Sequence, residues 1–352
     1  MSFVASAGIA SQPSGAGRPR VIVAGATGFT GALAAHLLWR HPDFELVAVT
    51  GRSELGRPLR EVYPRYRVPL EIEALEVERL QEIDAAVVAY PHAAAAPTVG
   101  ALHERGIRVV DLSADFRLGS LAAYERWYGE HPRPDLLADA VYGLTELYRD
   151  RIATAAIVAN PGCYPTASLL ALAPLACAGL IADVVIDAKQ GISGAGRVFD
   201  ETTHLSMAGE NIVPYKVAAH RHTPEIEEQL NELDPAHPGD LRVQFQAHLV
   251  PLDQGEMASC YVTTTRPLAA EELRELYTDA YAKEPFVELV DTPPGVLEVR
   301  ETNYCRVFAA ADEHTGKVIA FGAIDNLWKG TSSQAVQNLN LMFGLTETRG
   351  LL

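Results

Sequence analysis

The stretch Val21-Ile22-Val23-Ala24-Gly25-Ala26-Thr27-Gly28-Phe29-Thr30-Gly31 joins a short apolar run to a loop with a glycine at every third position. A helical pattern follows, with apolar residues at Leu33, Leu37 and Leu38. A buried strand, a glycine loop and a helix in this order hold a pyrophosphate on backbone N–H groups and the helix N-terminus. A plain turn is the alternative, but the position between strand and helix favours nucleotide binding by Gly25, Gly28 and Gly31.

Apolar runs and helical patterns alternate through the first part of the chain. Strands are expected at 21–24, 45–50, 85–89, 108–112 and 155–159, with a helix at 94–105. This alternation predicts an α/β, Rossmann-type doubly wound parallel sheet. Later strands at 184–188, 241–250, 257–265 and 305–311, with helices at 223–233 and 269–282, predict a second domain. That domain is expected to be α+β with a mainly antiparallel sheet.

The end of the second expected strand bears on the choice of cofactor. It reads Val49-Thr50-Gly51-Arg52-Ser53, without the acidic residue that binds the ribose hydroxyls of NAD. Arg52 and Ser53 suit a 2′-phosphate, which favours NADP(H). A solvated arginine in a loop is the alternative.

Cys163 lies between an expected strand and an expected helix, in the run Asn160-Pro161-Gly162-Cys163-Tyr164-Pro165. A proline suits the first turn of a helix, so the thiol is placed at a helix N-terminus. There the helix dipole favours the thiolate, the form that acts as nucleophile. A buried, inert cysteine is the alternative for this residue alone. The neighbouring motifs favour the nucleophile.

Two further motifs follow expected strands. Asp111-Leu112-Ser113-Ala114-Asp115-Phe116-Arg117 lies at the carboxyl edge of the first sheet, where Arg117 is expected either to clamp an anion or to pair with a nearby aspartate. Gly191-Ile192-Ser193-Gly194-Ala195-Gly196-Arg197 is expected to be either an anion-binding nest or a flexible loop.

His220-Arg221-His222 precedes the helical pattern that begins at Thr223-Pro224. Two histidines beside an arginine fit a general acid or base with an anion contact. They also fit two metal ligands, although no third ligand stands at a recognisable spacing and no metal is expected. A capping role without chemistry is the third interpretation.

The chain has 352 residues with 29 Lys and Arg against 45 Asp and Glu, a net charge of −16. Such a surface repels phosphate backbones and anionic lipids, so neither nucleic acid nor a membrane is an expected partner. The four cysteines are widely spaced, which favours reduced thiols and a cytoplasmic location over disulfides. The uncharged stretch 163–182 contains two prolines, which favours a buried helix over a membrane span.

Taken together, the motifs resemble the N-acetyl-gamma-glutamyl-phosphate reductase family, type 1. They read GATGFTG, DLSADFRL, PGCYPTA, SGAGR, HRHTPEI and AIDNLWKG, in this order over nearly the whole chain. The sequence departs from the family pattern at Ala93, Thr145 and Gln190, where Gly, Pro and Ser are usual. It also has Asp253-Gln254-Gly255 where Asn-Arg-Gly is usual.

The resemblance implies NADPH-dependent reduction of an acyl phosphate in arginine biosynthesis, through a thioester on Cys163. It implies that His220 or His222 acts as the acid or base, and that a small-molecule acyl phosphate is the substrate. Expected cofactor-binding residues are Gly25, Thr27, Gly28, Phe29, Thr30, Gly31, Arg52, Ser53, Ser193, Gly194 and Asn326. Expected substrate-binding residues are Ser113, Arg117, Asn160, Arg197 and Glu225.

The expected organisation has four parts. A disordered tail at 1–18 precedes an NADP-binding domain at 19–160 and a catalytic and oligomerisation domain at 161–325. A helix in 326–352 is expected to return to the first domain, and the protein to form a dimer or tetramer. Two other functions compete: the reductase of lysine biosynthesis, whose substrate is linked to a carrier protein, and a non-catalytic NADP-binding sensor. The second has little need for Cys163 and both histidines. Cys177, Cys260 and Cys305 are expected to be slow to react.

Overall fold

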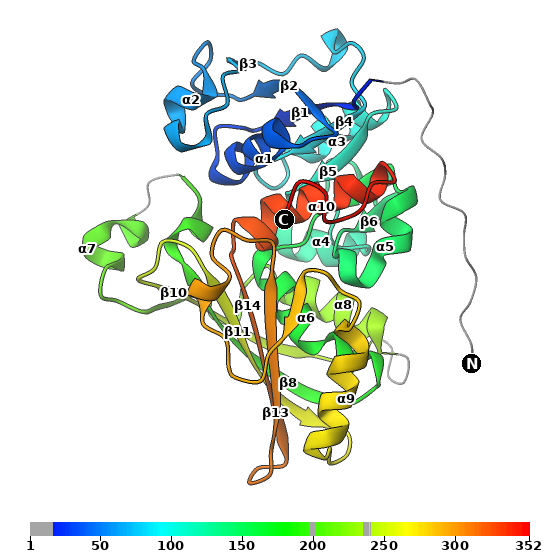
Figure 1. The fold of residues 1–352 in the computed structure, drawn as a ribbon, viewed down its shortest axis with the longest axis vertical. Helices are drawn as coiled ribbons and strands as arrows, with labels where there is room; N and C mark the ends of the chain where they lie inside the picture. Colours follow the sequence, from blue (N-terminus) through cyan, green and yellow to red (C-terminus); the bar gives the residue numbers. More distant parts are fainter. Residues whose placement is uncertain (1–16, 198–200, 235–238, 240) are drawn as a thin grey trace.

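The computed structural model describes residues 17–352 except 198–200, 235–238 and 240. It contains two sheets of seven strands each, one above the other in Figure 1. Residues 1–16, most of the expected tail, lie outside the described residues.

The first sheet is parallel throughout, with the strand order β3-β2-β1-β4-β5-β7-β6. Successive side chains of a strand point to opposite faces. Val21 and Val23 therefore pack in one core with helix α1 (Phe29–Arg40), and Ile22 and Ala24 pack in another with α3 (Ala96–His103). Helices on both faces confirm the expected doubly wound sheet. Its strands are β1 (Arg20–Ala24), β2 (Glu45–Thr50), β3 (Ile72–Glu73), β4 (Ala85–Val88), β5 (Arg108–Asp111), β6 (Ala140–Tyr142) and β7 (Ile157–Ala159).

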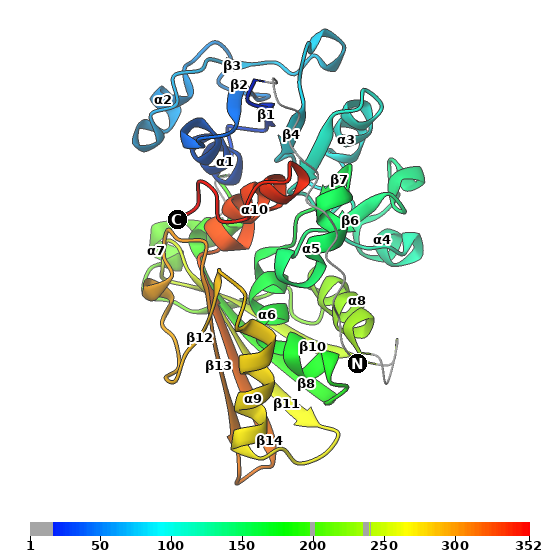
Figure 2. The ribbon, with the colours of Figure 1, turned by 45° about the vertical axis from the view of Figure 1, so that its right-hand side comes forward.

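The second sheet has the order β12-β13-β14-β11-β8-β10-β9. Only the pairs β8 with β10 and β12 with β13 are parallel, which confirms a mainly antiparallel sheet. Helices α6, α8 and α9 cover one face (Figure 2). The strands are β8 (Ile181–Gly191), β9 (Val213–Tyr215), β10 (Val243–Val250), β11 (Glu256–Thr264), β12 (Val287–Leu289), β13 (Cys305–Asp312) and β14 (Lys317–Ile324).

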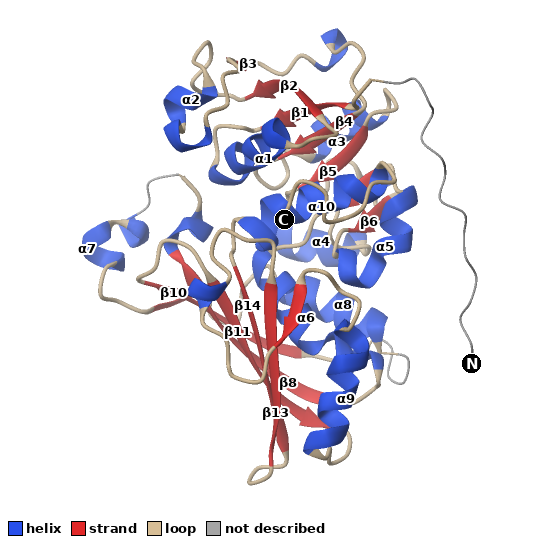
Figure 3. Cartoon of the chain, in the orientation of Figure 1, coloured by secondary structure: helices blue, strands red, loops and turns tan. Residues whose placement is uncertain are grey.

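Figure 3 shows the helices that connect and cover the sheets. Besides α1 and α3 they are α2 (Leu59–Val62), α4 (Leu121–Tyr128), α5 (Thr145–Thr154), α6 (Cys163–Cys177), α7 (Leu205–Ala208), α8 (Thr223–Leu233), α9 (Ala270–Tyr281) and α10 (Ser333–Met342). Strand β2 and helix α8 have the expected bounds. Strand β14 was not expected from the sequence, because its unbroken apolar run does not distinguish a buried strand from a buried helix.

The C-terminal segment passes from the second sheet back to the first. A π-helical turn, Trp328–Ser332, leads into α10, which lies between α1 and α5 (Figure 2). The Ser332 hydroxyl donates to the Thr30 carbonyl at 2.9 Å, directly at the start of α1. The expected single helix from Asn326 is therefore two elements, and both fasten the C-terminal segment to the glycine loop region.

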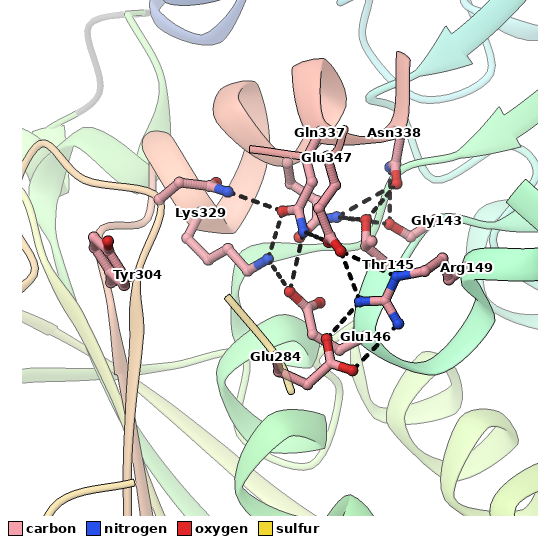
Figure 4. Close-up of polar contacts among 12 residues, drawn as sticks. Gly143, Thr145, Glu146, Arg149, Glu284, Tyr304, Lys329, Gln337, Asn338 and Glu347 are labelled. Carbon is pink, nitrogen blue, oxygen red and sulfur yellow. Dashed lines mark hydrogen bonds and ion pairs between the residues drawn. The ribbon is translucent and has the colours of Figure 1, made fainter. Parts of the chain in front are cut away.

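A buried polar network fixes this segment (Figure 4). The Lys329 ammonium donates to the Glu146 carboxylate at 2.6 Å and to the Gln337 side chain at 2.8 Å, and both side chains of the ion pair are 0% exposed. Gln337 also accepts a hydrogen bond from Asn303 at 2.8 Å. Residues of α5, α10 and the second domain thus meet around one buried lysine.

Candidate active site

Cys163 is the first residue of α6, and Gly162 is the N-cap. A residue of helix α8 holds the loop that precedes Cys163: the Glu225 carboxylate accepts a hydrogen bond from the Gly162 N–H at 2.8 Å. The expected helix N-terminal position of the thiol is therefore confirmed. Cys163 is partly exposed, whereas Cys260 and Cys305 are buried in strands.

A cavity of about 530 Å³ opens beside the thiol. It brings together parts of the chain that are far apart in the sequence, and its lining includes Cys163, Gln190, Gly194, Tyr215, Lys216, His220, Arg221 and His222. Among the described residues that line it there are two cations and no carboxylate. The cavity thus suits an anionic ligand, despite the acidic surface of the protein.

One side chain of the second sheet contacts the Cys163 thiol, and a carboxyl group of the same sheet lies behind it. The Gln190 amide lies 2.8 Å from the sulfur and donates to the Glu256 carboxylate at 2.6 Å. Burial raises the pKa of Cys163 well above its ordinary value, and the charge of Glu256 raises it further. The direction is opposite to the expected lowering, because in this structure desolvation and a carboxylate outweigh the helix dipole.

The two histidines lie next to each other, with ring centroids 5.0 Å apart. Burial lowers the pKa of His220 to about 3, and burial with the neighbouring His220 lowers the pKa of His222 well below its ordinary value. Both rings are therefore neutral near pH 7, so a histidine cation does not stabilise the thiolate here. The His222 ring packs on the cysteine loop: a Cβ on Gly162 would lie 2.6 Å from its Nε2. Its Nδ1 is buried without a hydrogen-bond partner among the described residues.

Four of the expected substrate-binding residues hold the cysteine loop together instead of lining the cavity. The buried Arg117 donates to the carbonyls of Asn160 at 2.7 Å and Leu112 at 2.8 Å, and pairs with Glu225 at 3.4 Å. Ser113 donates to Asp111 at 2.6 Å, and the Asn160 side chain bonds to the Thr331 carbonyl at 3.1 Å and to Asn338 at 3.1 Å. The structure therefore places Ser113, Arg117, Asn160 and Glu225 as positioning residues around the loop.

Arg197, the fifth expected substrate contact, lies at the glycine loop. Its guanidinium donates to the Thr27 carbonyl at 3.1 Å and pairs with Glu54 at 3.3 Å. It also stacks over the Tyr63 ring, with the guanidinium carbon 5.4 Å from the ring centroid. Arg197 thus bridges the two domains at the nucleotide side and does not line the cavity beside Cys163.

The glycine loop fits a dinucleotide. Gly25 has φ +96°, and a Cβ there would lie 2.5 Å from the Ala89 carbonyl. A Cβ on Gly31 would lie 2.2 Å from the Gly25 carbonyl, so strand and helix approach closely. By contrast, a Cβ on Gly28 would have no neighbour nearer than 3.8 Å, and this N-cap of α1 has no side-chain cap. The first N–H groups of α1 are therefore open toward a pyrophosphate.

The remaining expected cofactor residues lie on two sides of this loop. Arg52 and Ser53 are exposed, and the Arg52 guanidinium stacks over the Tyr90 ring at 4.8 Å. Asn326 donates to the Ser193 hydroxyl at 3.0 Å and accepts from the Gly255 N–H at 2.8 Å. Gly194 lines the cavity and packs on Gln190. Ser193 and Asn326 thus meet at the domain junction near the thiol.

Comparison with known proteins agrees with this geometry. Residues 20–155 match the model described as semialdehyde dehydrogenase, NAD binding domain, and residues 163–326 match semialdehyde dehydrogenase, dimerisation domain. N-acetyl-gamma-glutamyl-phosphate reductase from Desulforudis audaxviator is 48% identical over 95% of this chain and 98% of that protein. The protein of the same name from Moorella thermoacetica is 45% identical over 94% of this chain and 96% of its own. The chain belongs to the N-acetyl-gamma-glutamyl-phosphate reductase family.

Solved structures show that the fold extends beyond this reductase family. Aspartate semialdehyde dehydrogenase II from Vibrio cholerae has a TM-score of 0.71 and 19% identity, and the match covers 93% of this chain and 98% of that chain. Over the part of the chain that the structure describes, no helix is long and apolar enough to cross a membrane. The described residues also contain no group of three or more His, Cys, Asp or Glu side chains that could hold a metal ion.

Three of the departures from the reductase family pattern have visible consequences. Ala93 adopts φ 63°, in the left-handed region that favours glycine. The Thr145 hydroxyl donates to Asn338 at 2.8 Å, beside the cysteine loop. Gln190 forms the contact to the Cys163 sulfur.

Sequence reasoning missed Glu256 and Lys216. Glu256 begins a strand and would be expected to face solvent from its charge alone, yet it is 0% exposed. The available signal was a carboxylate between Gly255 and the strand expected at 257–265. Lys216 has φ 47° and enters the cavity from the segment before the histidines, where no sequence pattern indicates it.

Proposed function

We propose that this chain catalyses the NADPH-dependent conversion of N-acetyl-gamma-glutamyl phosphate to N-acetylglutamate 5-semialdehyde and phosphate, the reaction for which its relatives are named. The observation that carries the proposal is the thiol of Cys163 at the N-terminus of α6, in one cavity with His220 and His222. A thiol in this position supplies a covalent nucleophile for acyl transfer.

Cys163 attacks the acyl carbon, the bond to phosphate breaks, and a thioester forms on the enzyme. A bound nicotinamide supplies the hydride that reduces this thioester. The C–S bond then breaks and the aldehyde leaves. The backbone N–H groups of Cys163 and Tyr164, in the first turn of α6, are suited to stabilise the charge on the acyl oxygen. The neutral rings of His220 and His222 donate to or accept from the substrate inside the cavity.

Lys216 and Arg221 suit the anionic groups of the substrate. Both line the cavity, and no carboxylate stands among its described lining residues. The Tyr128 hydroxyl donates to the Arg221 carbonyl at 3.2 Å, and the guanidinium stacks over the Tyr128 ring at 5.2 Å, which holds this side chain in place. We assign the carboxylate of the N-acetylglutamyl group to this pair.

The decisive assay runs the reaction in reverse. N-acetylglutamate semialdehyde should support phosphate-dependent reduction of NADP⁺, and its one-carbon-longer homologue should not. Activity with the homologue alone would favour the lysine-pathway reductase instead. Binding of NADPH without turnover of either aldehyde would favour the non-catalytic sensor.

NADP(H) is proposed as the cofactor because Arg52 and Ser53 are exposed at the carboxyl end of β2, where an acidic residue would select NAD. Replacing Arg52 by Asp should weaken NADPH binding about 10- to 100-fold, since a hydrogen bond to a charged group contributes about 1.5–3 kcal/mol. NADH binding should change little. Fluorescence titration with both nucleotides measures this difference.

Arg126→Asp on α4 is the matched control, because it makes the same charge change at an exposed arginine of another element. It should leave both affinities unchanged. Equal use of NADPH and NADH by the unaltered protein would contradict the assignment of Arg52.

A homo-oligomer is proposed from the matched dimerisation domain and from the face of the second sheet opposite α6. Along this face the strands present half-buried or exposed apolar side chains, which are Tyr261, Phe308, Ile319 and Phe321. An apolar sheet face of this kind is suited to pairing with a second copy. Native mass measurement of the full chain tests this oligomeric state, and a monomer would contradict it.

The four free cysteines fit a reducing compartment, and we place the protein in the cytoplasm.

A further inference from the structure

Gln190 and Glu256 form a buried pair of polar side chains beside the Cys163 thiol. The two residues are direct neighbours across the antiparallel strands β8 and β11. Their side chains meet at 2.6 Å, and the Gln190 amide reaches the Cys163 sulfur at 2.8 Å. Register between the two strands thus places a carboxyl group next to the nucleophile.

Glu256 is buried, and only one of its two carboxyl oxygens has a hydrogen-bond partner among the described residues. Its side chain is 0% exposed, and Oε1 has no hydrogen-bond partner among the described residues. Its other oxygen, Oε2, accepts a hydrogen bond from the Gln190 amide, which carries no charge. A buried carboxyl group with an open oxygen is costly to maintain, and carboxyl groups in such surroundings cluster at functional sites.

We propose that Glu256 is the acid–base group of the Cys163 thiol, and that Gln190 holds it in place. This inference rests on the proposed function, in which Cys163 is the nucleophile. The hydrogen bond to the sulfur comes from Gln190 and not from either described histidine. That leaves His220 and His222 to contact the substrate.

The proton of the thiol then stays between Cys163 and Glu256 throughout the cycle. Glu256 takes the proton of the thiol as the S–C bond forms. When the acyl C–O bond breaks, the departing phosphate oxygen takes a proton from water in the cavity, so hydrogen phosphate leaves, while Glu256 keeps the proton of the thiol. After reduction of the thioester, the C=O bond re-forms and the C–S bond breaks. The resulting thiolate regains from Glu256 the proton that it gave up in the first step.

The charge environment supports this assignment. Burial, with a smaller contribution from the charge of Asp325, raises the pKa of Glu256 to about 8, although the interactions with Cys163 and Gln190 act in the opposite direction. The groups that face it are Cys163 from α6, Gln190 from β8 and Asp325 after β14, with the hydroxyls of Tyr164 and Tyr215 farther away. Glu256 and Cys163 are therefore coupled: once one of the pair is negative, the other resists losing its proton.

The test follows the alkylation of Cys163 by iodoacetamide from pH 6 to pH 10, in a Cys177→Ser background because Cys177 is exposed at the end of α6. With Glu256 present, the alkylation rate should rise about tenfold per pH unit and then flatten above about pH 8, where the carboxylate forms and opposes the thiolate. In Glu256→Gln the rise should continue without this plateau. Turnover of the acyl phosphate should nevertheless fall about 100-fold or more, because proton transfer is lost.

Faster alkylation at high pH together with slower turnover separates an acid–base role from a structural one, which would lower both. Glu256→Asp keeps the carboxyl group and should keep the plateau, and it provides the comparison if the Gln variant does not fold. Glu228→Gln is the matched control, since burial also raises the pKa of Glu228 but this residue lies away from Cys163, bonded to the Gly119 N–H.

Two results would overturn the proposal: a Glu256→Gln profile that flattens like that of the unaltered enzyme, or turnover within threefold of it. Loss of the plateau in His222→Ala but not in Glu256→Gln would assign the proton to the histidine instead. Failure of the proposed function is a separate outcome, because an acyl group on a residue other than Cys163 would appear in both proteins by mass spectrometry.

Discussion

Replacing Cys163 by Ser should reduce acyl-phosphate reduction by at least about a thousandfold, since loss of a catalytic nucleophile has effects of this size or larger. An alkoxide is far harder to form than a thiolate, and burial beside Glu256 opposes both. NADPH binding should persist, because the glycine loop at the start of α1 is a separate element. Single-turnover kinetics and nucleotide titration of the same preparation measure the two effects.

Acylation gives the complementary observation. Incubation with acyl phosphate and no NADPH should place the acyl group on Cys163, as mass spectrometry of peptides can show. Cys177→Ser is the control and should retain turnover. Cys177 is exposed, but desolvation raises the pKa of its thiol, and the expectation that it reacts slowly stays a prediction. Near-normal activity of Cys163→Ser would end the thioester mechanism.

Replacing Lys329 by Met should lower the free energy of unfolding by about 3–5 kcal/mol, the usual cost of breaking a buried ion pair by removing one partner. The change leaves the Glu146 carboxylate in a site where both side chains are 0% exposed. It also removes a contact to Gln337, through which α10 is joined to the second domain (Figure 4). Urea denaturation followed by fluorescence measures the loss.

A double variant isolates the cause. Lys329→Met with Glu146→Gln removes the uncompensated charge and should recover most of the lost stability. Glu82→Gln is the control at an exposed pair with Arg20, at 2.9 Å, and should change stability by less than about 1 kcal/mol. A loss in Lys329→Met no greater than that in Glu82→Gln would show that the network does not stabilise the fold.

Features that depend on neighbouring residues were predictable from the sequence. The strand, glycine loop and helix at 20–40 form as expected. Hydrophobic periodicity and glycine spacing predict them because both signals are contained within a few consecutive residues. For the same reason Cys163 was placed correctly at the start of α6. The roles of Arg117 and Glu225 were not predictable, since a charged side chain in a motif can face either a ligand or its own loop. Only the packed structure shows that both hold the loop before Cys163.

The sequence alone determined the two-sheet architecture, the glycine loop and the position of the nucleophile, because each is set by local geometry. Tertiary structure alone decided what surrounds the sulfur. Gln190 and Glu256 are separated by many residues and meet only through the register of β8 with β11. Their effect on the pKa of Cys163 then depends on how completely α6 and the second sheet exclude water. Desolvation is a property of the whole packed site, and no stretch of sequence carries it.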